Sequence, residues 1–286
     1  MNAPAMQAQI VSAPYVCPDC KKPLTHWRCA VCGHEFPCSD GVPRLVSRNP
    51  RFEHAAAIAS AYDTIYTERS QAWENQGRTP EFIAWFGELL DRFAAARMLE
   101  IGCGEGFVLA TRREGVRFAT DLSVAAIRRA RKRADAHFSL ALAERLPFAA
   151  DSFDLVASVG VMEHFLDIGE ALAEIRRVLA PGGLYVGLTH VALTPRERLG
   201  WIGAQFVFPR LRPLALARWL APRLRSRLPW HRADVPQQPI QNRYTTAGAQ
   251  AWLACSGFTV EEVLHTRADR SLPLIGPSVV VFVARK

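Results

Sequence analysis

The chain has 286 residues, of which 49% are hydrophobic and 22% charged, and its formal net charge is +8. This apolar content excludes a largely disordered protein, and the length suffices for one large core plus a small module. The amino terminus lacks the pattern of a signal peptide, and no uncharged apolar run approaches the roughly 18 residues of a membrane span. We therefore expect a cytoplasmic protein, or one attached peripherally to the inner face of the membrane.

Residues 1–47 are predicted to form a separate zinc-ribbon module. Two Cys-x-x-Cys pairs lie eight residues apart in this segment, a spacing that lets four thiolates meet around Zn²⁺. So small a module cannot bury enough surface to fold alone, so the metal would be structural. The predicted ligands are Cys17, Cys20, Cys29 and Cys32. Four free cysteines or a redox pair are the alternatives, with Cys38 and His34 as substitute ligands.

The same segment resembles the Trm112-like zinc ribbon in most of its motifs. These motifs are Cys17-Pro-Asp-Cys20, Pro23-Leu24, Cys29-Ala-Val-Cys32-Gly, Phe36-Pro37 and Asp40-Gly-Val-Pro43. Members of that family often stand beside methyltransferases or are fused to them. The resemblance therefore implies that a methyltransferase follows in residues 48–286.

Two amphipathic helices are expected before the main sheet begins. Apolar residues recur at helical spacing from Ala55 to Tyr66, and a second stripe runs through residues 79–95. Thr79 suits the N-cap of the second helix, and Pro80 suits its first position. We expect the second stripe to pack against a sheet.

From Arg97 onward, strands and helices alternate as a parallel sheet requires. Strands are expected at 98–101, 116–120, 137–142, 152–159, 184–189, 258–264 and 278–284. Helices are expected from near Glu105 and over 124–134, 168–179 and 246–256, with a turn at Pro181-Gly182-Gly183. This order predicts an α/β fold with a Rossmann-like, seven-stranded, mostly parallel sheet covered by helices on both faces. The basic residues of 124–134 are expected to be a solvated face.

A glycine loop follows the first predicted strand. Gly102, Gly104 and Gly106 let the backbone turn sharply and let a ligand approach closely. The amino end of a helix after the loop would stabilise an anionic group. The loop thus predicts a nucleotide-type site at the carboxyl end of the strand. Its G-x-G-x-G spacing departs from the dinucleotide pattern G-x-G-x-x-G, so other motifs must identify the nucleotide.

Four further motifs identify it. Asp121 ends the second strand, where a carboxylate can accept hydrogen bonds from both ribose hydroxyls, and the run 143–148 follows the third strand. Residues 151–156 open the fourth strand, and 178–183 end the next helix. In this order the motifs resemble the class I S-adenosylmethionine-dependent methyltransferases, in the branch of the ubiquinone and menaquinone methyltransferases, over roughly residues 55–190.

The resemblance implies S-adenosylmethionine as cofactor. The glycine loop would hold its methionine end, Glu100 its amino group and Asp121 its ribose, while Tyr62 would close over it. The implied cofactor-binding residues are Tyr62, Glu100, Gly102, Cys103, Gly104, Gly106, Asp121, Leu122, Leu142, Ala143 and Glu144. Leu142 stands where many relatives have an acidic residue, so the bond to the adenine amino group is absent here or supplied by another residue.

The segment 161–165 follows the fourth strand at the rim that would face the methyl group. S-adenosylmethionine carries an activated methyl, so the protein mainly supplies alignment and excludes water. A hydroxyl acceptor would also benefit from a base. His164 is the candidate catalytic residue, because its pKa suits that role, and His190 is the second candidate. Packing and capping of the next helix by Glu163 and His164 is the alternative.

Residues 191–245 are predicted to be a helical insert that covers the substrate. The insert contains ten arginines and two acidic residues, so it accounts for the whole net charge of the chain. Its tryptophans and leucines between the arginines suit an anionic membrane surface, or a long apolar substrate that carries phosphate. A helical lid with solvated arginines is the alternative, and RNA binding is less favoured because the insert has no lysine.

The sequence as a whole predicts an S-adenosylmethionine-dependent methyltransferase with a structural Zn²⁺. The methyl acceptor is expected to be an oxygen or carbon atom on a small or lipid-like metabolite. This metabolite is the expected binding partner. One alternative is methylation of RNA or of a translation protein. Another is a non-catalytic scaffold that binds S-adenosylmethionine.

Overall fold

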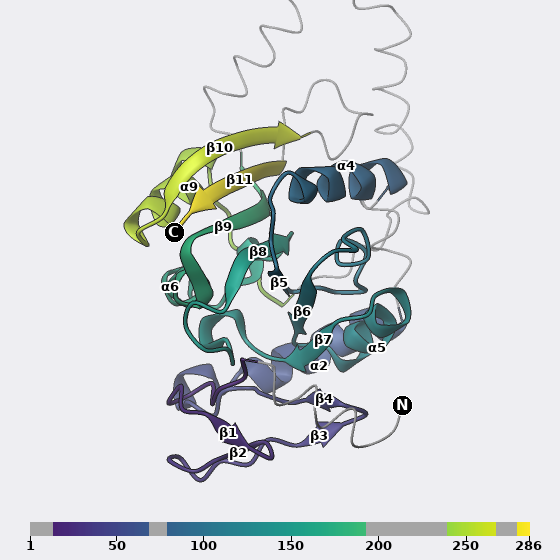
Figure 1. Ribbon diagram of the computed structural model, residues 1–286, viewed down its shortest axis with the longest axis vertical. Coiled ribbons are helices and arrows are strands. Elements are labelled where there is room, and N and C mark those ends of the chain that lie inside the picture. Colours follow the sequence, from purple (N-terminus) through teal and green to yellow (C-terminus); the bar gives the residue numbers. More distant parts are fainter. Residues whose placement is uncertain (1–13, 69–78, 193–238, 267–278) are drawn as a thin grey trace, which may run out of the picture.

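Seven strands form one sheet at the centre of the computed structural model, which describes residues 14–68, 79–192, 239–266 and 279–286 (Figure 1). Their order across the sheet is β10-β11-β9-β8-β5-β6-β7. The strands are β5 (Arg97–Ile101), β6 (Val116–Asp121), β7 (His137–Leu140), β8 (Phe153–Val159), β9 (Leu179–His190), β10 (Thr259–Thr266) and β11 (Val279–Arg285). The predicted α/β fold is confirmed.

The sheet is mostly parallel, as predicted. The pairs β5–β6, β6–β7, β5–β8 and β8–β9 run parallel, whereas β11 runs antiparallel to β9 and β10. β5 is the first strand of this sheet along the chain, yet it lies between β6 and β8. The connections from this point lead to opposite sides of the sheet, and ligands of open α/β sheets bind at such a switch point.

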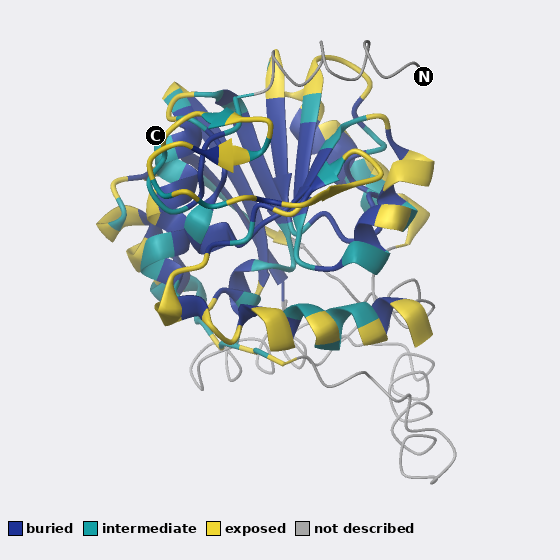
Figure 2. Ribbon diagram, turned by 90° about the horizontal axis from the view of Figure 1, so that it is seen from below, coloured by how far each residue is buried: buried dark blue, intermediate teal, exposed yellow. Residues whose placement is uncertain are grey.

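Helices cover both faces of the sheet, and most residues of its strands are buried, apart from those of the edge strand β10 (Figure 2). On β11, Val280 and Phe282 pack in one core with α6 (Ile168–Val178) and α9 (Thr246–Cys255). Val279 and Val281 pack in the opposite core with α4 (Pro80–Asp91). Because both faces are covered, this strand is apolar at successive positions instead of at alternate ones.

The helices begin where the sequence provides caps. Thr79 accepts a hydrogen bond from the amide of Phe82 at the start of α4, as predicted, and Ser123 and Asp167 cap α5 (Val124–Arg133) and α6 in the same way. α2 (Ala55–Glu68) covers the apolar run predicted to be helical. Within the described residues, no helix is both long and apolar enough to cross a membrane.

One local prediction is wrong, and a second differs in where the strand begins. The segment predicted to be a helix near Glu105 is a series of turns. The segment between Gly106 and Gly115 is short, and the chain turns at Gly115, which has a φ of 76° and packs against the carbonyls of Ala95 and Ala96. The predicted turn at 181–183 lies within β9, which pairs with β8 on both sides of it. Leu179 opposes Phe153 and Leu184 opposes Leu155, so residues 180–183 loop out of the pairing with β8.

The ribbon, residues 14–47, lies beside β7 and α2 (Figure 1). It contains β1 (Leu24–Thr25), β2 (Arg28–Cys29), β3 (Cys38–Ser39) and β4 (Val42–Pro43), paired as two short hairpins. Arg44 forms a parallel bridge with Leu140, and the Tyr15 ring stacks on Phe148 at 5.2 Å between centroids. The ribbon therefore covers the edge strand of the sheet, and the predicted boundary at residue 47 stays a prediction.

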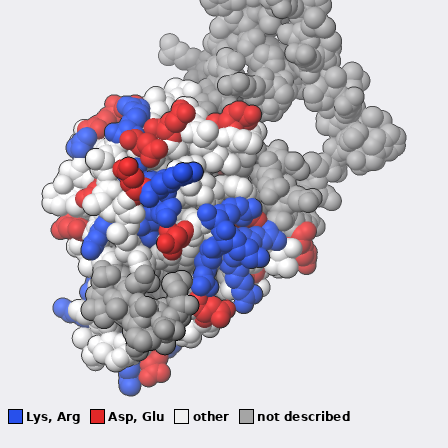
Figure 3. Space-filling model, turned by 45° about the vertical axis from the view of Figure 1, so that its right-hand side comes forward, with Lys and Arg blue, Asp and Glu red and all other residues white. Residues whose placement is uncertain are grey.

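The basic residues of α5 lie on an exposed face, where Figure 3 shows blue side chains gathered. Arg128, Arg131 and Lys132 are exposed, as predicted for a solvated face. Arg129 is instead half-buried and donates to Glu105 at 2.6 Å. The predicted insert lies almost entirely outside the described residues, which resume at Pro239.

Candidate active site

A cavity lies at the carboxyl ends of β5, β6, β7 and β8. Several predicted cofactor-binding residues line it, together with the predicted base. These are Tyr62, Gly102, Asp121, Leu122, Leu142, Ala143, Glu144 and His164. Glu100, Cys103, Gly104 and Gly106 are buried behind this wall.

Gly102 shapes the wall beside the switch point. Its φ is 62°, and a Cβ at this position would lie 2.5 Å from the Cγ2 of Val161. Only glycine adopts this backbone conformation easily and leaves Val161 in place. The loop therefore brings peptide backbone to the cavity surface without a side chain, as expected for close approach of a ligand.

Asp121 fixes the loop from the end of β6. Its Oδ2 accepts a hydrogen bond from the Gly104 amide at 2.8 Å, and its Oδ1 accepts one from the Ser123 amide at 2.8 Å. A carboxylate has about four acceptor positions, so both oxygens can accept further hydrogen bonds from the cavity. Asp121 thus suits a ligand with neighbouring hydroxyl groups.

One face of α2 forms the cover of the cavity. Ile58, Tyr62 and Tyr66 are spaced four apart and all line it. Next to Tyr62, Asp63 accepts hydrogen bonds from the Ser123 hydroxyl at 2.6 Å and from the Ala125 amide at 2.9 Å. These bonds attach α2 to the start of α5, so the cover is held in place.

The Tyr62 hydroxyl is buried and has no hydrogen-bond partner among the described residues. Burial raises the pKa of this phenol well above its ordinary value, so the group is a neutral donor. A buried unsatisfied hydroxyl costs about 1–3 kcal/mol. A polar ligand in the cavity would satisfy it.

Glu144 has a structural role in addition to the predicted position beside adenine. Its Oε1 accepts hydrogen bonds from the amides of Leu166 at 2.6 Å and Asp167 at 3.3 Å. Burial raises the pKa of this carboxyl. The side chain therefore holds the turn before α6 while it forms part of the cavity wall.

His164 lies in the cavity wall, as the prediction of a base requires. Its Nδ1 is 2.5 Å from the carbonyl oxygen of Ile240, and its ring lies edge-on to Tyr62 at 6.3 Å between centroids. Burial lowers the pKa of His164, although Glu163 opposes this. The ring is therefore neutral near neutral pH, with Nδ1 as donor and Nε2 as acceptor.

Glu163 and His190 form a hydrogen bond at the end of β9. The Glu163 side chain is only 2% exposed, and its Oε1 is 2.5 Å from Nδ1 of His190. The hydrogen bond to Glu163 raises the pKa of His190. Burial alone would raise the pKa of Glu163, but its interactions with His190 hold it below the ordinary value.

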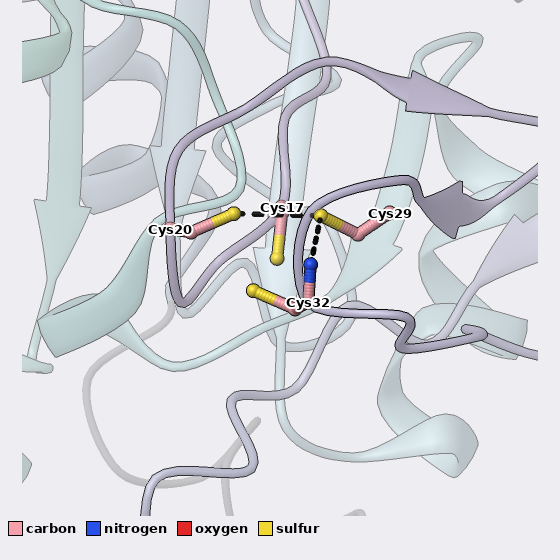
Figure 4. Close-up of side chains that lie close together, drawn as sticks. All are labelled: Cys17, Cys20, Cys29 and Cys32. Carbon is pink, nitrogen blue, oxygen red and sulfur yellow. Dashed lines mark hydrogen bonds between the residues drawn. The ribbon is translucent and has the colours of Figure 1, made fainter.

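The four predicted metal ligands converge in the ribbon (Figure 4). The Sγ atoms of Cys17, Cys20, Cys29 and Cys32 all lie within 4.8 Å of one another, and all four are free thiols. Sulfurs around a tetrahedral Zn²⁺ are about 3.8 Å apart for Zn–S bonds of about 2.3 Å. The cluster therefore fits a four-thiolate zinc site.

Comparison with known proteins connects the cavity to a family. Residues 99–187 match the family described as "Methyltransferase domain". The chain therefore has the fold of the class I S-adenosylmethionine-dependent methyltransferases, and this segment resembles their methyltransferase domain. The match includes the glycine loop, Asp121 and the segment with His164.

A ubiquinone biosynthesis O-methyltransferase of Brucella anthropi is 30% identical to this chain over 122 residues, 40% of this chain and 49% of that protein. The chain thus spans about half the length of this curated relative. A structure of a Thermotoga maritima S-adenosylmethionine-dependent methyltransferase, a possible histamine N-methyltransferase, has a TM-score of 0.54 and 17% identity, covering 79% of this chain and 99% of that one.

A second structure has the same fold. It is a complex between the Haloferax volcanii Trm112 methyltransferase activator and a putative methyltransferase, with a TM-score of 0.54 and 17% identity, covering 78% of this chain and 96% of that one. At this identity the likeness shows the fold of the methyltransferase domain alone.

Sequence reasoning missed several residues of the cavity. Ile58 and Tyr66 were assigned to an apolar helix face, yet their spacing of four on either side of Tyr62 could have indicated a shared orientation. Ile240 gave no signal, because it reaches the cavity from a segment distant in sequence.

Proposed function

We propose that this methyltransferase domain transfers the methyl group of S-adenosylmethionine to an oxygen atom of a small or lipid-like metabolite. The cavity carries the proposal, because Gly102, Asp121 and Tyr62 provide close backbone approach, acceptors for hydroxyls and an unsatisfied donor in one space. The name of the curated relative favours an oxygen acceptor over a carbon acceptor.

When bound, S-adenosylmethionine supplies a methyl group already activated by its sulfonium. Asp121 would accept hydrogen bonds from its ribose hydroxyls, and Leu122 and Leu142 would form an apolar wall for its adenine. Leu142 offers no side-chain hydrogen bond to the adenine amino group. α2 would exclude water from the cavity, since Asp63 holds it over the opening. These residues bind and align, which is most of what methyl transfer requires.

A hydroxyl acceptor must lose its proton as the methyl group is transferred. Two imidazoles lie at this edge of the sheet, His164 in the cavity wall and His190 at the end of β9. His164 was predicted as the base, and its neutral ring keeps it a candidate. His164 requires an acceptor bound in the cavity, and His190 requires one bound between the cavity and the end of β9.

The ribbon is proposed to bind a structural Zn²⁺ through its four cysteines. The activator named in the Haloferax volcanii complex is a Trm112 protein, the family that the ribbon resembles. We propose that the ribbon stabilises the methyltransferase domain within one chain. The insert is proposed to cover the substrate, with an anionic membrane as a further partner.

Transfer of radiolabelled methyl from S-adenosylmethionine by the full chain tests the function. A cell extract would be divided into lipid, small-molecule, RNA and protein fractions and incubated with the wild-type chain or Asp121→Ala. Label in the lipid or small-molecule fraction, lost in Asp121→Ala, supports the proposal. Label in RNA or protein would contradict the acceptor class. Cofactor binding without labelling of any fraction would favour a scaffold.

A further inference from the structure

The carboxylate of Glu163 is enclosed by two residues of β9. Its Oε1 is 2.5 Å from Nδ1 of His190, and its Oε2 accepts a hydrogen bond from the Thr189 hydroxyl at 2.8 Å. Because an ionised carboxylate only accepts hydrogen bonds, Nδ1 of His190 carries the hydrogen. In the neutral ring, Nε2 then carries the lone pair. The His190 side chain is 59% exposed, so Nε2 can be reached from outside.

His190 lies on the side of the cavity opposite β6 and Asp121. Val159 pairs with Leu188, and the Gly160 amide donates to the Leu188 carbonyl at 2.9 Å. Thr189 and His190 therefore form the end of β9 beside Gly160 and Val161, which line the cavity. A molecule that approaches the cavity from β9 would meet the exposed imidazole.

We infer that His190 is the catalytic base for a hydroxyl acceptor and that Glu163 positions its ring, an inference that rests on the proposed function. In the step, the acceptor O–H proton goes to Nε2 of His190, and the oxygen lone pair forms the bond to the methyl carbon. The carbon–sulfur bond breaks, and its electron pair returns to sulfur to give the neutral thioether. The imidazolium formed is stabilised by the adjacent Glu163 carboxylate.

The two histidines differ in what supports them. Nδ1 of His164 contacts a neutral carbonyl, that of Ile240, and its ring packs against Tyr62. Nδ1 of His190 contacts a buried carboxylate instead. Consistently, the pKa of His190 is raised by Glu163, whereas that of His164 is lowered by burial. A charged hydrogen-bond partner makes His190 the stronger base.

Other titratable groups face the same carboxylate. Tyr62 on α2, Tyr185 on β9 and Tyr244 ahead of α9 each have a raised pKa, chiefly through burial and partly through the charge of Glu163. These phenols remain neutral when His190 titrates. Glu163 stays ionised over the same pH range, because its pKa is held below its ordinary value, so His164 is the other described group near this pair that titrates.

Two phenolic probes separate a base from a structural residue. Catechol is largely protonated at neutral pH, whereas the nitro group of 4-nitrocatechol leaves it largely ionised. We expect His190→Gln to lower methyl transfer to catechol about 100-fold, and transfer to 4-nitrocatechol less than about tenfold. The matched control is His265→Gln, at an exposed position on β10. His164→Gln should show no such dependence on the probe.

The pH profile tests the positioning role of Glu163. The activity on catechol should rise with pH as His190 loses its proton. Glu163→Gln removes the charge that raises the pKa of His190, so this rise should move to lower pH while the maximal rate falls. Histidine side-chain NMR should show the same direction of change at His190. Glu163→Asp keeps the negative charge, so its pH profile and maximal rate should lie closer to those of the wild type.

Several results would overturn the inference. Equal losses on both probes in His190→Gln, with unchanged cofactor affinity, would mean that His190 only supports the structure. A larger loss on catechol in His164→Gln would assign the base to His164. A wild-type chain that binds S-adenosylmethionine but labels only amine, thiol or carbon acceptors would remove the need for the base. Failure to bind S-adenosylmethionine would instead contradict the proposed function itself.

Discussion

Lys21 of the ribbon and Glu174 of α6 form a 2.6 Å ion pair across 153 positions of sequence. Their side chains are 25% and 11% exposed. Lys21 also donates to the Leu146 carbonyl at 3.2 Å, and Glu174 accepts from Arg177 at 2.7 Å. The charged contact thus attaches the ribbon to the domain that holds the cavity.

Lys21→Met should destabilise the attachment. Because Glu174 keeps Arg177 as a partner, we expect a loss of about 1 kcal/mol in the free energy of unfolding. The control is Arg28→Met, since Arg28 and Glu35 form an ion pair whose side chains are 64% and 71% exposed. That variant should change stability by less than about 0.5 kcal/mol. Denaturant unfolding measures the free energy of unfolding of both variants. Equal losses would mean that the Lys21 contact stabilises the protein no more than an exposed ion pair does.

Removal of zinc should loosen the ribbon and expose the sheet edge. We expect the wild-type chain to bind one zinc ion, and Cys29→Ser to lose it and melt more than about 5 °C lower. Cys38→Ser is the matched control, because Cys38 is exposed and lies outside the thiol cluster. Metal analysis and thermal unfolding test this. Retention of a full equivalent of zinc by Cys29→Ser would contradict the assignment of the ligands.

Gly102→Ala should affect the cofactor cavity in addition to stability. The alanine would be strained at positive φ and would also push against Val161. Gly182→Ala is the control, because Gly182 has a φ of 75° but open space around its Cβ position. Each should lose about 1–2 kcal/mol of stability from the backbone strain. Only Gly102→Ala should lower the affinity for S-adenosylmethionine, measured by calorimetry, and equal affinities would contradict this role.

Tyr62→Phe should separate cofactor binding from stability. Its hydroxyl has no partner among the described residues, so the unliganded chain should lose no stability. If the hydroxyl donates to the cofactor, affinity should fall about 2- to 12-fold, corresponding to one hydrogen bond of about 0.5–1.5 kcal/mol. Tyr185→Phe should do the reverse, because its buried hydroxyl bonds to Ser158 at 2.7 Å. A Tyr62→Phe variant that loses stability but no affinity would be inconsistent with a ligand at this hydroxyl.

Local signals predicted the sheet and most of the helices. The strand before Gly102 and the cap at Thr79 depend on residues near one another in sequence, so the pattern fixed their positions closely. The expected helix after the glycine loop failed for a tertiary reason. Gly115 ends the segment against the backbone at Ala95 and Ala96, a contact that no local pattern reveals.

The site was predicted where its motifs are local. Asp121 and Leu142 follow strands of a parallel sheet, so their place at the cavity follows from the fold. Contacts between segments distant in sequence could not be predicted from local motifs. The pairing of Glu163 with His190 requires β8 and β9 to lie in register, and the docking of Tyr15 on Phe148 requires the folded sheet edge.

Binding of S-adenosylmethionine to the full chain tests the central claim most directly. Calorimetric titration should show one bound cofactor per wild-type chain, with affinity reduced about 10- to 100-fold in Asp121→Asn, since charge-assisted hydrogen bonds contribute about 1.5–3 kcal/mol. Asp91→Asn, at a position 60% exposed at the end of α4, should bind like the wild type. A folded wild-type chain that binds no S-adenosylmethionine, or an Asp121→Asn variant with unchanged affinity, would contradict the assignment of the cavity.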